Sequence, residues 1–316
     1  MGWKVLVTSL PMLATIEYCQ KHFEAKNFEV VVPEIRGQQL SEAALCEIIA
    51  EFDGVLAGDD PFTANVLETG RKGRLRALVR WGIGIDAVDV KAAQRLGIRF
   101  SNTPGVFNDE VADIAIGYLL LLARGLHKVD AAARNGQWLK YKGRSLRGKV
   151  AGVVGVGNIG KEIVRRVRSF GMETIGYQRH ALDPDFLAET GMRQVEGEEL
   201  FRSADCIFLA CSLNPENYHL LNARAFAMMK AGVWIINVAR GALIDEHALL
   251  DALECGKVGA AGLDVFENEP LPAHHPLRRF EQVVLGAHNG SNTHEAVLRA
   301  SKVAIDLLAR FLRETH

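Results

Sequence analysis

The chain has 316 residues, enough for two domains at about 150 residues each. Its 37 lysines and arginines balance 38 aspartates and glutamates, and the resulting net charge of −1 excludes the cationic excess of a broad nucleic-acid or anionic-membrane surface. Hydrophobic residues make up 48% and charged residues 24%, so the bulk of the chain is neither disordered nor collagen-like.

The cysteines and the apolar runs indicate the cellular compartment of the protein. The five cysteines are odd in number and form no CxxC pair, so we predict neither a disulfide framework nor a metal site, and a reducing cytoplasm fits best. The first residues lack the layout of a signal peptide, and the longest apolar stretch, residues 114–123, is too short to cross a bilayer.

Short β-branched runs alternate with amphipathic segments of helix length in the first hundred residues. Helices are predicted, for example, at residues 42–51 and 88–95. Strands are predicted at residues 4–8, 28–32, 54–57, 77–79 and 99–101. This alternation is typical of a parallel sheet covered by helices.

One long helix is predicted next, over about residues 108–135. Its Ile114 and the four leucines at 119–122 make it apolar on nearly all sides, which is typical of a buried helix. Such a helix could be covered by the other domain or by a second subunit. A turn-rich segment follows, as far as Lys149.

The alternation then resumes, and the chain closes with a helix over about residues 293–313. Strands are predicted at residues 150–154, 173–177, 206–211, 233–238, 258–263 and 283–285. The sequence therefore predicts an α/β protein of two doubly wound parallel-sheet domains, the second inserted so that the closing helix returns to the first.

A G-x-G-x-x-G follows the predicted strand at 150–154 and opens a helix. In such a loop Gly155 permits the tight turn, Gly157 lets a pyrophosphate approach the backbone, and Gly160 lets helix and strand pack closely. Phosphates then sit at the helix N-terminus, where free N–H groups favour anions. The strand before, the helix after and a second strand about 20 residues later favour a dinucleotide site over an ordinary strand–turn–helix.

The residues after that second strand bear on the choice of dinucleotide. NAD-selective sites usually carry an acidic residue there, whereas this chain has Gln178 and Arg179. A neutral residue does not repel a 2′-phosphate, and an adjacent arginine can hold it with charge-assisted bonds worth roughly 1.5–3 kcal/mol. We therefore favour NADP, with NAD possible. The alternative is that Arg179 is a solvated surface residue.

Three further strands end in polar residues. Arg240 follows the strand at 233–238, three carboxylates including Glu267 and Glu269 follow that at 258–263, and His288 follows that at 283–285. Ligands of parallel sheets bind at the carboxyl ends of strands, so these side chains can face one crevice. A histidine, a carboxylate and an arginine suit hydride transfer to a 2-oxo acid. Spacing alone does not separate Glu269 from Glu267.

Taken in order, these segments resemble one family over nearly the whole chain: the D-isomer-specific 2-hydroxyacid dehydrogenases, most closely the phosphoglycerate dehydrogenase and hydroxypyruvate/glyoxylate reductase branch. The motifs that carry the resemblance lie at residues 80–86, 102–105, 146–149 leading into the glycine loop, 237–241, 262–267 and around His288.

The resemblance implies a role for each matching residue. Arg240 would bind substrate, Glu269 would pair with the histidine, and His288 would donate and accept the proton. The amides of Gly82 and Ile83 would hold the substrate carboxylate, and Arg80 is a candidate anion contact. Asp264 would bind the nicotinamide carboxamide. Further cofactor contacts would be Asn158, Ile159, Ser212, Val238, Ala239 and Gly290.

The resemblance also implies an arrangement: a Rossmann cofactor domain over residues 102–286, inserted in a flavodoxin-like substrate domain formed by residues 1–101 and 287–316. A homodimer would be built on the long helix. The predicted activity interconverts a 2-hydroxy acid and a 2-oxo acid, with 3-phosphoglycerate, hydroxypyruvate or glyoxylate types all open. Arg80 is the only support for a phosphorylated substrate. The alternative from another class is a dinucleotide-gated scaffold or corepressor of the same fold.

Overall fold

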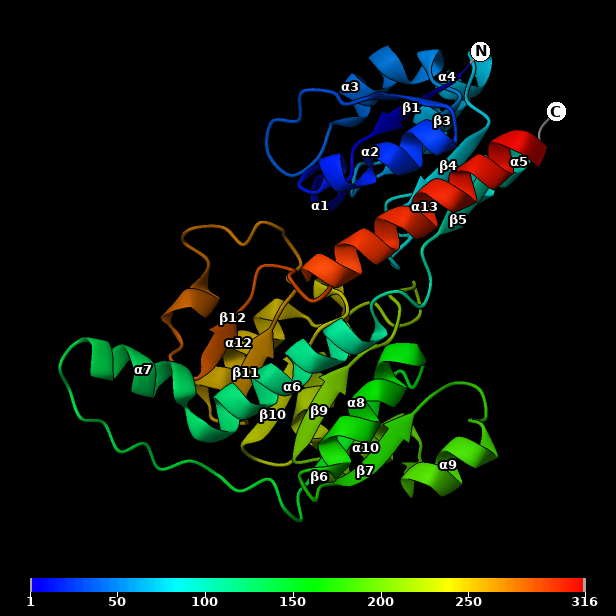
Figure 1. Ribbon diagram of the computed structural model, residues 1–316. Coiled ribbons are helices and arrows are strands. Elements are labelled where there is room, and N and C mark those ends of the chain that lie inside the picture. Colours follow the sequence, from blue (N-terminus) through cyan, green and yellow to red (C-terminus); the bar gives the residue numbers. More distant parts are fainter. Residues whose placement is uncertain (1, 315–316) are drawn as a thin grey trace. The chain divides into compact units, whose positions relative to one another are not determined.

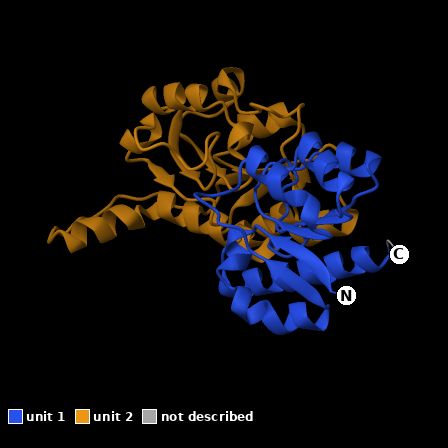
Figure 2. Cartoon of the chain, turned by 90° about the horizontal axis from the view of Figure 1, so that it is seen from above, with its two compact units in different colours: residues 1–107, 292–316 blue, residues 108–291 orange. Residues whose placement is uncertain are grey.

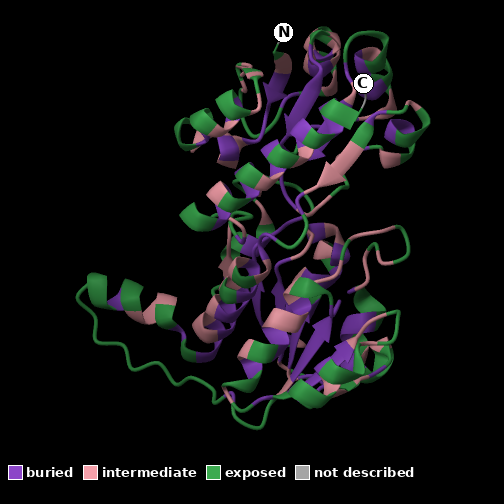
Figure 3. Ribbon diagram, turned by 45° about the vertical axis from the view of Figure 1, so that its right-hand side comes forward, coloured by how far each residue is buried: buried purple, intermediate pink, exposed green. Residues whose placement is uncertain are grey.

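The computed structural model describes residues 2–314, which divide into two compact units. Of the described residues, unit 1 comprises 2–107 and 292–314, and unit 2 comprises 108–291 (Figure 2). Each unit has a parallel sheet covered by helices, as predicted, and in each the central strands are buried (Figure 3).

Unit 1 contains a five-stranded parallel sheet in the order β2-β1-β3-β4-β5. This is the flavodoxin-like order. The strands are β1 Trp3–Val7, β2 Phe28–Val31, β3 Gly54–Ala57, β4 Ala77–Arg80 and β5 Arg99–Asn102. The helices are α1 Leu10–Leu13, α2 Ile16–Ala25, α3 Glu42–Ile48, α4 Ala64–Lys72, α5 Val90–Arg95 and α13 His294–Glu314, with a 3₁₀ turn at Ile49–Glu51.

The closing helix α13 belongs to unit 1 because it packs on the sheet that the first hundred residues form. It contacts β3, β4 and α2, and its buried stripe includes Ala304, Ile305 and Leu308. Gly54 allows this approach, since a Cβ there would lie 2.9 Å from a methyl group of Leu308.

Unit 2 contains a seven-stranded parallel sheet in the order β12-β11-β10-β9-β6-β7-β8. The chain runs outward from β6 to β8, then returns to pair β9 with the other side of β6, which is the doubly wound order of dinucleotide-binding domains. The strands are β6 Val150–Val154, β7 Glu173–Tyr177, β8 Arg193–Gln194, β9 Cys206–Leu209, β10 Val233–Asn237, β11 Val258–Leu263 and β12 Val283–Leu285. The helices are α6 Asn108–Arg124, α7 Leu126–Arg134, α8 Asn158–Arg168, α9 Pro184–Thr190, α10 Gly197–Ser203, α11 Ala223–Met228 and α12 Glu246–Glu254, with 3₁₀ turns at Gly241–Leu243 and Pro276–Arg279.

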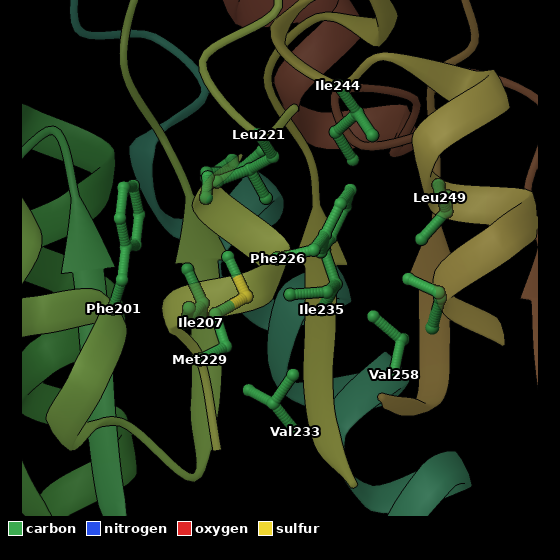
Figure 4. Close-up of a cluster of buried hydrophobic side chains, with 14 of the residues drawn as sticks. Phe201, Ile207, Leu221, Phe226, Met229, Val233, Ile235, Ile244, Leu249 and Val258 are labelled. Atoms are coloured by element: carbon green, nitrogen blue, oxygen red, sulfur yellow. The ribbon is translucent and has the colours of Figure 1, made fainter. Parts of the chain in front are cut away.

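Two apolar layers hold the sheet of unit 2. On one face, Ile207 of β9 and Ile235 of β10 gather with Phe226 and Met229 (Figure 4). Each buried side chain of this kind contributes roughly 1.5–3 kcal/mol, so the central strands are fixed in place. On the other face, α6 contacts β10, β11 and β12 and packs beside α8 (Figure 1).

The prediction of a single helix over residues 108–135 is wrong. The chain forms two helices, because Gly125 adopts a left-handed conformation (φ +58°) between α6 and α7. A side chain at 125 would be strained in that conformation, and its Cβ would lie 2.6 Å from the ring of Tyr141. The leucine run continues up to the break, so the apolar pattern alone did not reveal it. Beyond Gly125, α7 and residues 135–145 extend away from the body of unit 2 as an arm (Figures 1 and 3).

Most other predicted elements agree with the structure to within one or two residues. The predicted helix at 42–51 ends at Ile48 and tightens into a 3₁₀ turn, and the two-residue strand β8 was not predicted. None of the helices within residues 2–314 combines the length and apolar character that a membrane crossing needs.

Candidate active site

The glycine loop lies between β6 and α8, with Gly157 as the N-cap of the helix. Gly155 has φ +88°, and a Cβ there would lie 2.5 Å from the backbone of Cys211, while a Cβ on Gly160 would lie 2.0 Å from the Gly155 carbonyl oxygen. At Gly157, by contrast, no heavy atom of the described residues lies within 4 Å of the Cβ position, apart from the glycine, its chain neighbours and the backbone of its own helix. Two glycines are thus needed for packing and the third leaves open backbone, a cradle that fits a dinucleotide pyrophosphate.

The loop after β9 faces the glycine loop across the point where the strand order reverses. Its backbone is held by its own asparagines: the side-chain amide of Asn217 donates to the carbonyl of Ser212 (2.7 Å), and Asn217 Oδ1 accepts from the Asn214 N–H (2.7 Å). Ligands of doubly wound sheets bind at this switch point, so Ser212 lies on the expected edge.

Gln178 and Arg179 follow β7 on the same edge. Gln178 Oε1 accepts the N–H of Val156 in the glycine loop (2.9 Å), which leaves its amide NH₂ as the group it can offer to a ligand. The guanidinium of Arg179 pairs with the carboxylate of Glu216 at 2.5 Å, and both side chains are exposed. Gln194 adds support by donating to the carbonyl of Gln178 (3.0 Å).

Arg240 follows the buried strand β10 and is positioned by Asn237 at the end of that strand. Asn237 Oδ1 accepts from the Ala239 N–H (3.0 Å), and its amide donates to the Arg240 carbonyl (2.8 Å). The Arg240 guanidinium donates to the Ala239 carbonyl (2.8 Å). The asparagine thus turns the backbone so that Val238, Ala239 and Arg240 lie at the carboxyl edge of the sheet.

Asp264, directly after β11, ties together the loops of the site. Its carboxylate is 1% exposed and accepts hydrogen bonds from the Tyr118 hydroxyl (3.0 Å), the Asn289 N–H (3.1 Å) and the Gly290 N–H (2.9 Å). Burial, and then the charge of Asp264, raise the pKa of Tyr118 well above its ordinary value, so the phenol remains a donor. Asp264 therefore fixes the segment that carries His288.

Glu269 and His288 form the central contact of the site. His288 Nδ1 lies 2.6 Å from Glu269 Oε2, while Glu269 Oε1 accepts the N–H of Phe266 (2.9 Å). The backbone N–H of His288 donates to the Asp264 carbonyl (2.7 Å), and His288 adopts φ +52°. Because Nδ1 faces the carboxylate, the other ring nitrogen, Nε2, is the one that can face a substrate.

The charges around Glu269 keep it ionised. Burial alone would raise the pKa of this carboxyl group. The hydrogen bond and charge of His288, with the Phe266 N–H and the charge of Arg240, outweigh burial, so the pKa of Glu269 lies below its ordinary value. A fixed carboxylate beside an imidazole is the arrangement of a histidine general acid, and the positive charge of Arg240 acts on the same carboxylate.

The three predicted substrate contacts lie in unit 1. Arg80 is buried at the end of β4, where its guanidinium pairs with Asp59 and donates to the Trp81 carbonyl. The Gly82 N–H already donates to Thr103 Oγ1 (2.9 Å), and Asn102 donates to the Ile83 carbonyl (2.7 Å). The Gly82 N–H therefore has a partner within the chain that a substrate carboxylate would have to displace.

Four residues around the site were not singled out from the sequence: Tyr118, Gln194, Glu216 and Asn237. Tyr118 lies in the middle of an apolar helix and Glu216 in a polar loop, so neither stands out by its surroundings. Asn237 could have been found, because a buried strand that ends in asparagine needs a partner for its amide.

Comparisons with known proteins agree with this geometry. Residues 116–290 match the family model of the D-isomer specific 2-hydroxyacid dehydrogenase, NAD binding domain. The chain belongs to the D-isomer specific 2-hydroxyacid dehydrogenase family. This dehydrogenase is therefore an oxidoreductase with an NAD-binding domain, and the alternative of a gated scaffold is not favoured.

Relatives of this dehydrogenase include proteins of two named activities. This dehydrogenase is 38% identical over 286 residues to the hydroxypyruvate reductase of Thermotoga maritima, and the match covers 89% of this chain and 90% of that protein. It is 37% identical over 279 residues to the D-3-phosphoglycerate dehydrogenase of Methanocaldococcus jannaschii, covering 87% of this chain but 52% of that protein. Among solved structures, the TT0316 protein of Thermus thermophilus matches with a TM-score of 0.86 and 31% identity, covering 98% of this chain and 97% of that one.

Proposed function

We propose that this dehydrogenase reduces a small, unphosphorylated 2-oxo acid of the hydroxypyruvate or glyoxylate type to the 2-hydroxy acid, and catalyses the reverse oxidation. The 2.6 Å contact between Glu269 and His288, with the charge of Arg240 acting on the same carboxylate, carries the proposal. A bound reduced nicotinamide supplies the hydride, and one proton completes the balance between the keto and the hydroxy acid.

The three side chains then have separate tasks. His288, as the imidazolium, donates a proton from Nε2 to the carbonyl oxygen as charge develops there. Glu269 accepts from Nδ1 and so stabilises the charged ring and fixes its orientation. Arg240 binds the substrate through charge-assisted hydrogen bonds and stabilises the developing oxyanion. In the oxidation, neutral His288 takes the hydroxyl proton.

The cofactor contacts form a second set. Gly155, Gly157 and Gly160 with the amides of Asn158 and Ile159 would hold the pyrophosphate, and Asp264 would accept from the carboxamide. Ser212, Val238, Ala239 and Gly290 would line the same edge. Support comes from the open backbone at Gly157 and from the strand order, which reverses beside β6.

We propose NADP as the preferred dinucleotide. Gln178 has committed its oxygen to the Val156 N–H, so it presents donors, which suit a 2′-phosphate. Arg179 is paired with Glu216 in an exposed contact that costs roughly 0–1 kcal/mol to open. The Arg179 guanidinium can therefore exchange Glu216 for a more strongly charged anion.

Replacing Arg179 by alanine is expected to lower the ratio of kcat/KM for NADPH over NADH by about tenfold or more, since one charge-assisted contact is lost. The ratio is measured for the wild type and the variant with the same acid. Arg193→Ala, which removes another exposed arginine paired with a glutamate, serves as the control. An unchanged ratio in Arg179→Ala would remove the residue from cofactor selection.

The preference for an unphosphorylated acid rests on unit 1. Arg80 is buried in a pair with Asp59, and the negative charge of Asp59 would repel a doubly charged phosphate more than the singly charged carboxylate of an unphosphorylated acid. We propose that Arg80 and the Ile83 amide, with Gly82 if its N–H is released from Thr103, contact the substrate carboxylate.

The proton donor gives the reduction a pH dependence. Reduction needs the imidazolium of His288, so a rise in pH that removes its proton slows reduction. Glu269, with its lowered pKa, stays ionised at neutral and mildly acidic pH and remains the partner of the ring. In Glu269→Gln the imidazolium loses its charged partner, so this decline is expected at a lower pH than in the wild type. The kcat profile from about pH 5 to 10 measures the shift. Glu281→Gln, at an exposed glutamate, should leave the profile in place.

We also propose that unit 2 acts as the cofactor domain, that unit 1 carries substrate contacts, and that the dehydrogenase forms a homodimer through α6 and the arm. Trp138 on the arm is 89% exposed, and Leu126, Leu139 and Tyr141 of the same arm are exposed as well. Apolar side chains gathered on a projecting segment are typical of an interface. A cytoplasmic location is proposed because the five cysteines are all free thiols.

A further inference from the structure

The loop that carries Glu269 meets the segment that carries Arg240 at a pair of glutamates. Glu267 Oε1 accepts the N–H of Glu246 (3.2 Å), and Glu246 Oε1 accepts the N–H of Glu267 (2.9 Å). The two residues are 21 positions apart in sequence, and each side chain bonds the backbone of the other. Such a reciprocal pair fixes two backbone segments against each other, because movement of either would break both hydrogen bonds.

Each glutamate also has a histidine beside it. His219 Nε2 lies 2.8 Å from Glu267 Oε1, and His275 Nε2 lies 3.0 Å from Glu246 Oε2. His275 Nδ1 accepts from the Leu277 N–H (3.3 Å), so Nε2 carries the hydrogen that faces Glu246. Each histidine thus lies against one carboxylate of the pair, and the Nε2–H of His275 points at Glu246.

The same two segments touch a second time, closer to the site. A Cβ on Gly241 would lie 1.8 Å from the carbonyl carbon of Phe266, so only glycine allows the backbone of residue 241 to lie against the 266–267 peptide. Arg240 immediately precedes that contact, and Glu269 lies two residues after Glu267.

We propose that Glu246 and Glu267 are positioning residues that set the place of Arg240 relative to the Glu269–His288 pair. Neither is a catalytic residue. Glu267, accepting at the first turn of α12, anchors the loop at 264–269, and that loop presents Glu269 to His288. The inference rests on the proposed roles of Arg240, Glu269 and His288.

The test compares Glu267→Ala with Glu267→Gln, using the full chain, NADPH and the best acid substrate. The alanine variant should lose about tenfold to a hundredfold in kcat, since a displacement near 1 Å can cost that much. Its Kd for NADPH should stay within about twofold. Glutamine keeps an oxygen that can accept the Glu246 N–H, so it should restore kcat to within about threefold of the wild type. An alanine variant that loses stability but keeps full kcat would overturn the proposal.

The second glutamate supplies an independent arm. Glu246→Ala should lower kcat to a similar degree, and the double alanine variant should lose far less than the product of the two single losses, because either change breaks the same clamp. If the loss of kcat in the double variant equalled the product of the two single losses, Glu246 and Glu267 would not act as one reciprocal pair. Glu254→Ala, at the other end of α12, is the matched control. If His288→Asn is inactive and Glu267→Ala is fully active, only the positioning role of Glu246 and Glu267 is wrong. If His288→Asn is fully active, the proposed function itself is wrong.

Discussion

Replacing His288 by asparagine is expected to lower kcat for 2-oxo acid reduction by about a hundredfold to ten-thousandfold, the range that a positioned general acid contributes. Asparagine keeps a donor that can face Glu269 but cannot deliver a proton to the carbonyl oxygen. The Kd of the variant for NADPH should remain close to that of the wild type, because the glycine loop lies between β6 and α8, away from the segment that follows β12. Stopped-flow absorbance of the cofactor measures the rate of hydride transfer directly.

The matched control for this change is His247→Asn. His247 is exposed on α12 in the same unit, and its replacement should leave kcat within about twofold of the wild type. If His288→Asn transferred hydride at the wild-type rate, another group would have to supply the proton, and the role given to His288 would be wrong.

Arg240→Lys is expected to lower kcat/KM by about a hundredfold to a thousandfold although the positive charge is kept. A guanidinium presents two parallel donors to a carboxylate or a developing oxyanion, whereas an ammonium is a point charge on a flexible stem. Because the loss affects transition-state binding, kcat should fall as well as KM rise.

The comparison for Arg240→Lys is Arg224→Lys, an exposed arginine on α11 of the same unit. That change should have no measurable effect on kcat/KM. An Arg240→Lys enzyme that kept the wild-type kcat/KM would show that two-donor geometry at this position contributes nothing.

The sheets could be predicted from sequence because their central strands are buried on both faces. Runs such as residues 150–154 and 258–263 are almost continuously apolar, so periodicity and glycine punctuation located them to the residue. The strand β8 was missed because it has two polar residues, Arg193 and Gln194, and depends on pairing with β7. The break at Gly125 was missed because one glycine in an apolar helix is tolerated elsewhere, and only its left-handed φ ends α6 here.

The sequence predicted which strand ends carry the site residues, but not which side chains contact one another there. Glu267 and Glu269 follow the same strand two residues apart, and nothing in their spacing assigns one to His288. The fold separates them, since Glu267 turns to the first turn of α12 and Glu269 to the imidazole. The partners of Arg179 and Asp264, Glu216 and Tyr118, are 37 and 146 residues away in sequence, which no local pattern can reveal.

The central claim is tested most directly by a steady-state panel of the wild-type enzyme with glyoxylate, hydroxypyruvate, pyruvate and 3-phosphohydroxypyruvate, each with NADPH and NADH. The account predicts cofactor oxidation, fastest with an unphosphorylated acid and NADPH, and a product of the D configuration. Tight binding of both dinucleotides without oxidation by any of the four acids would contradict it.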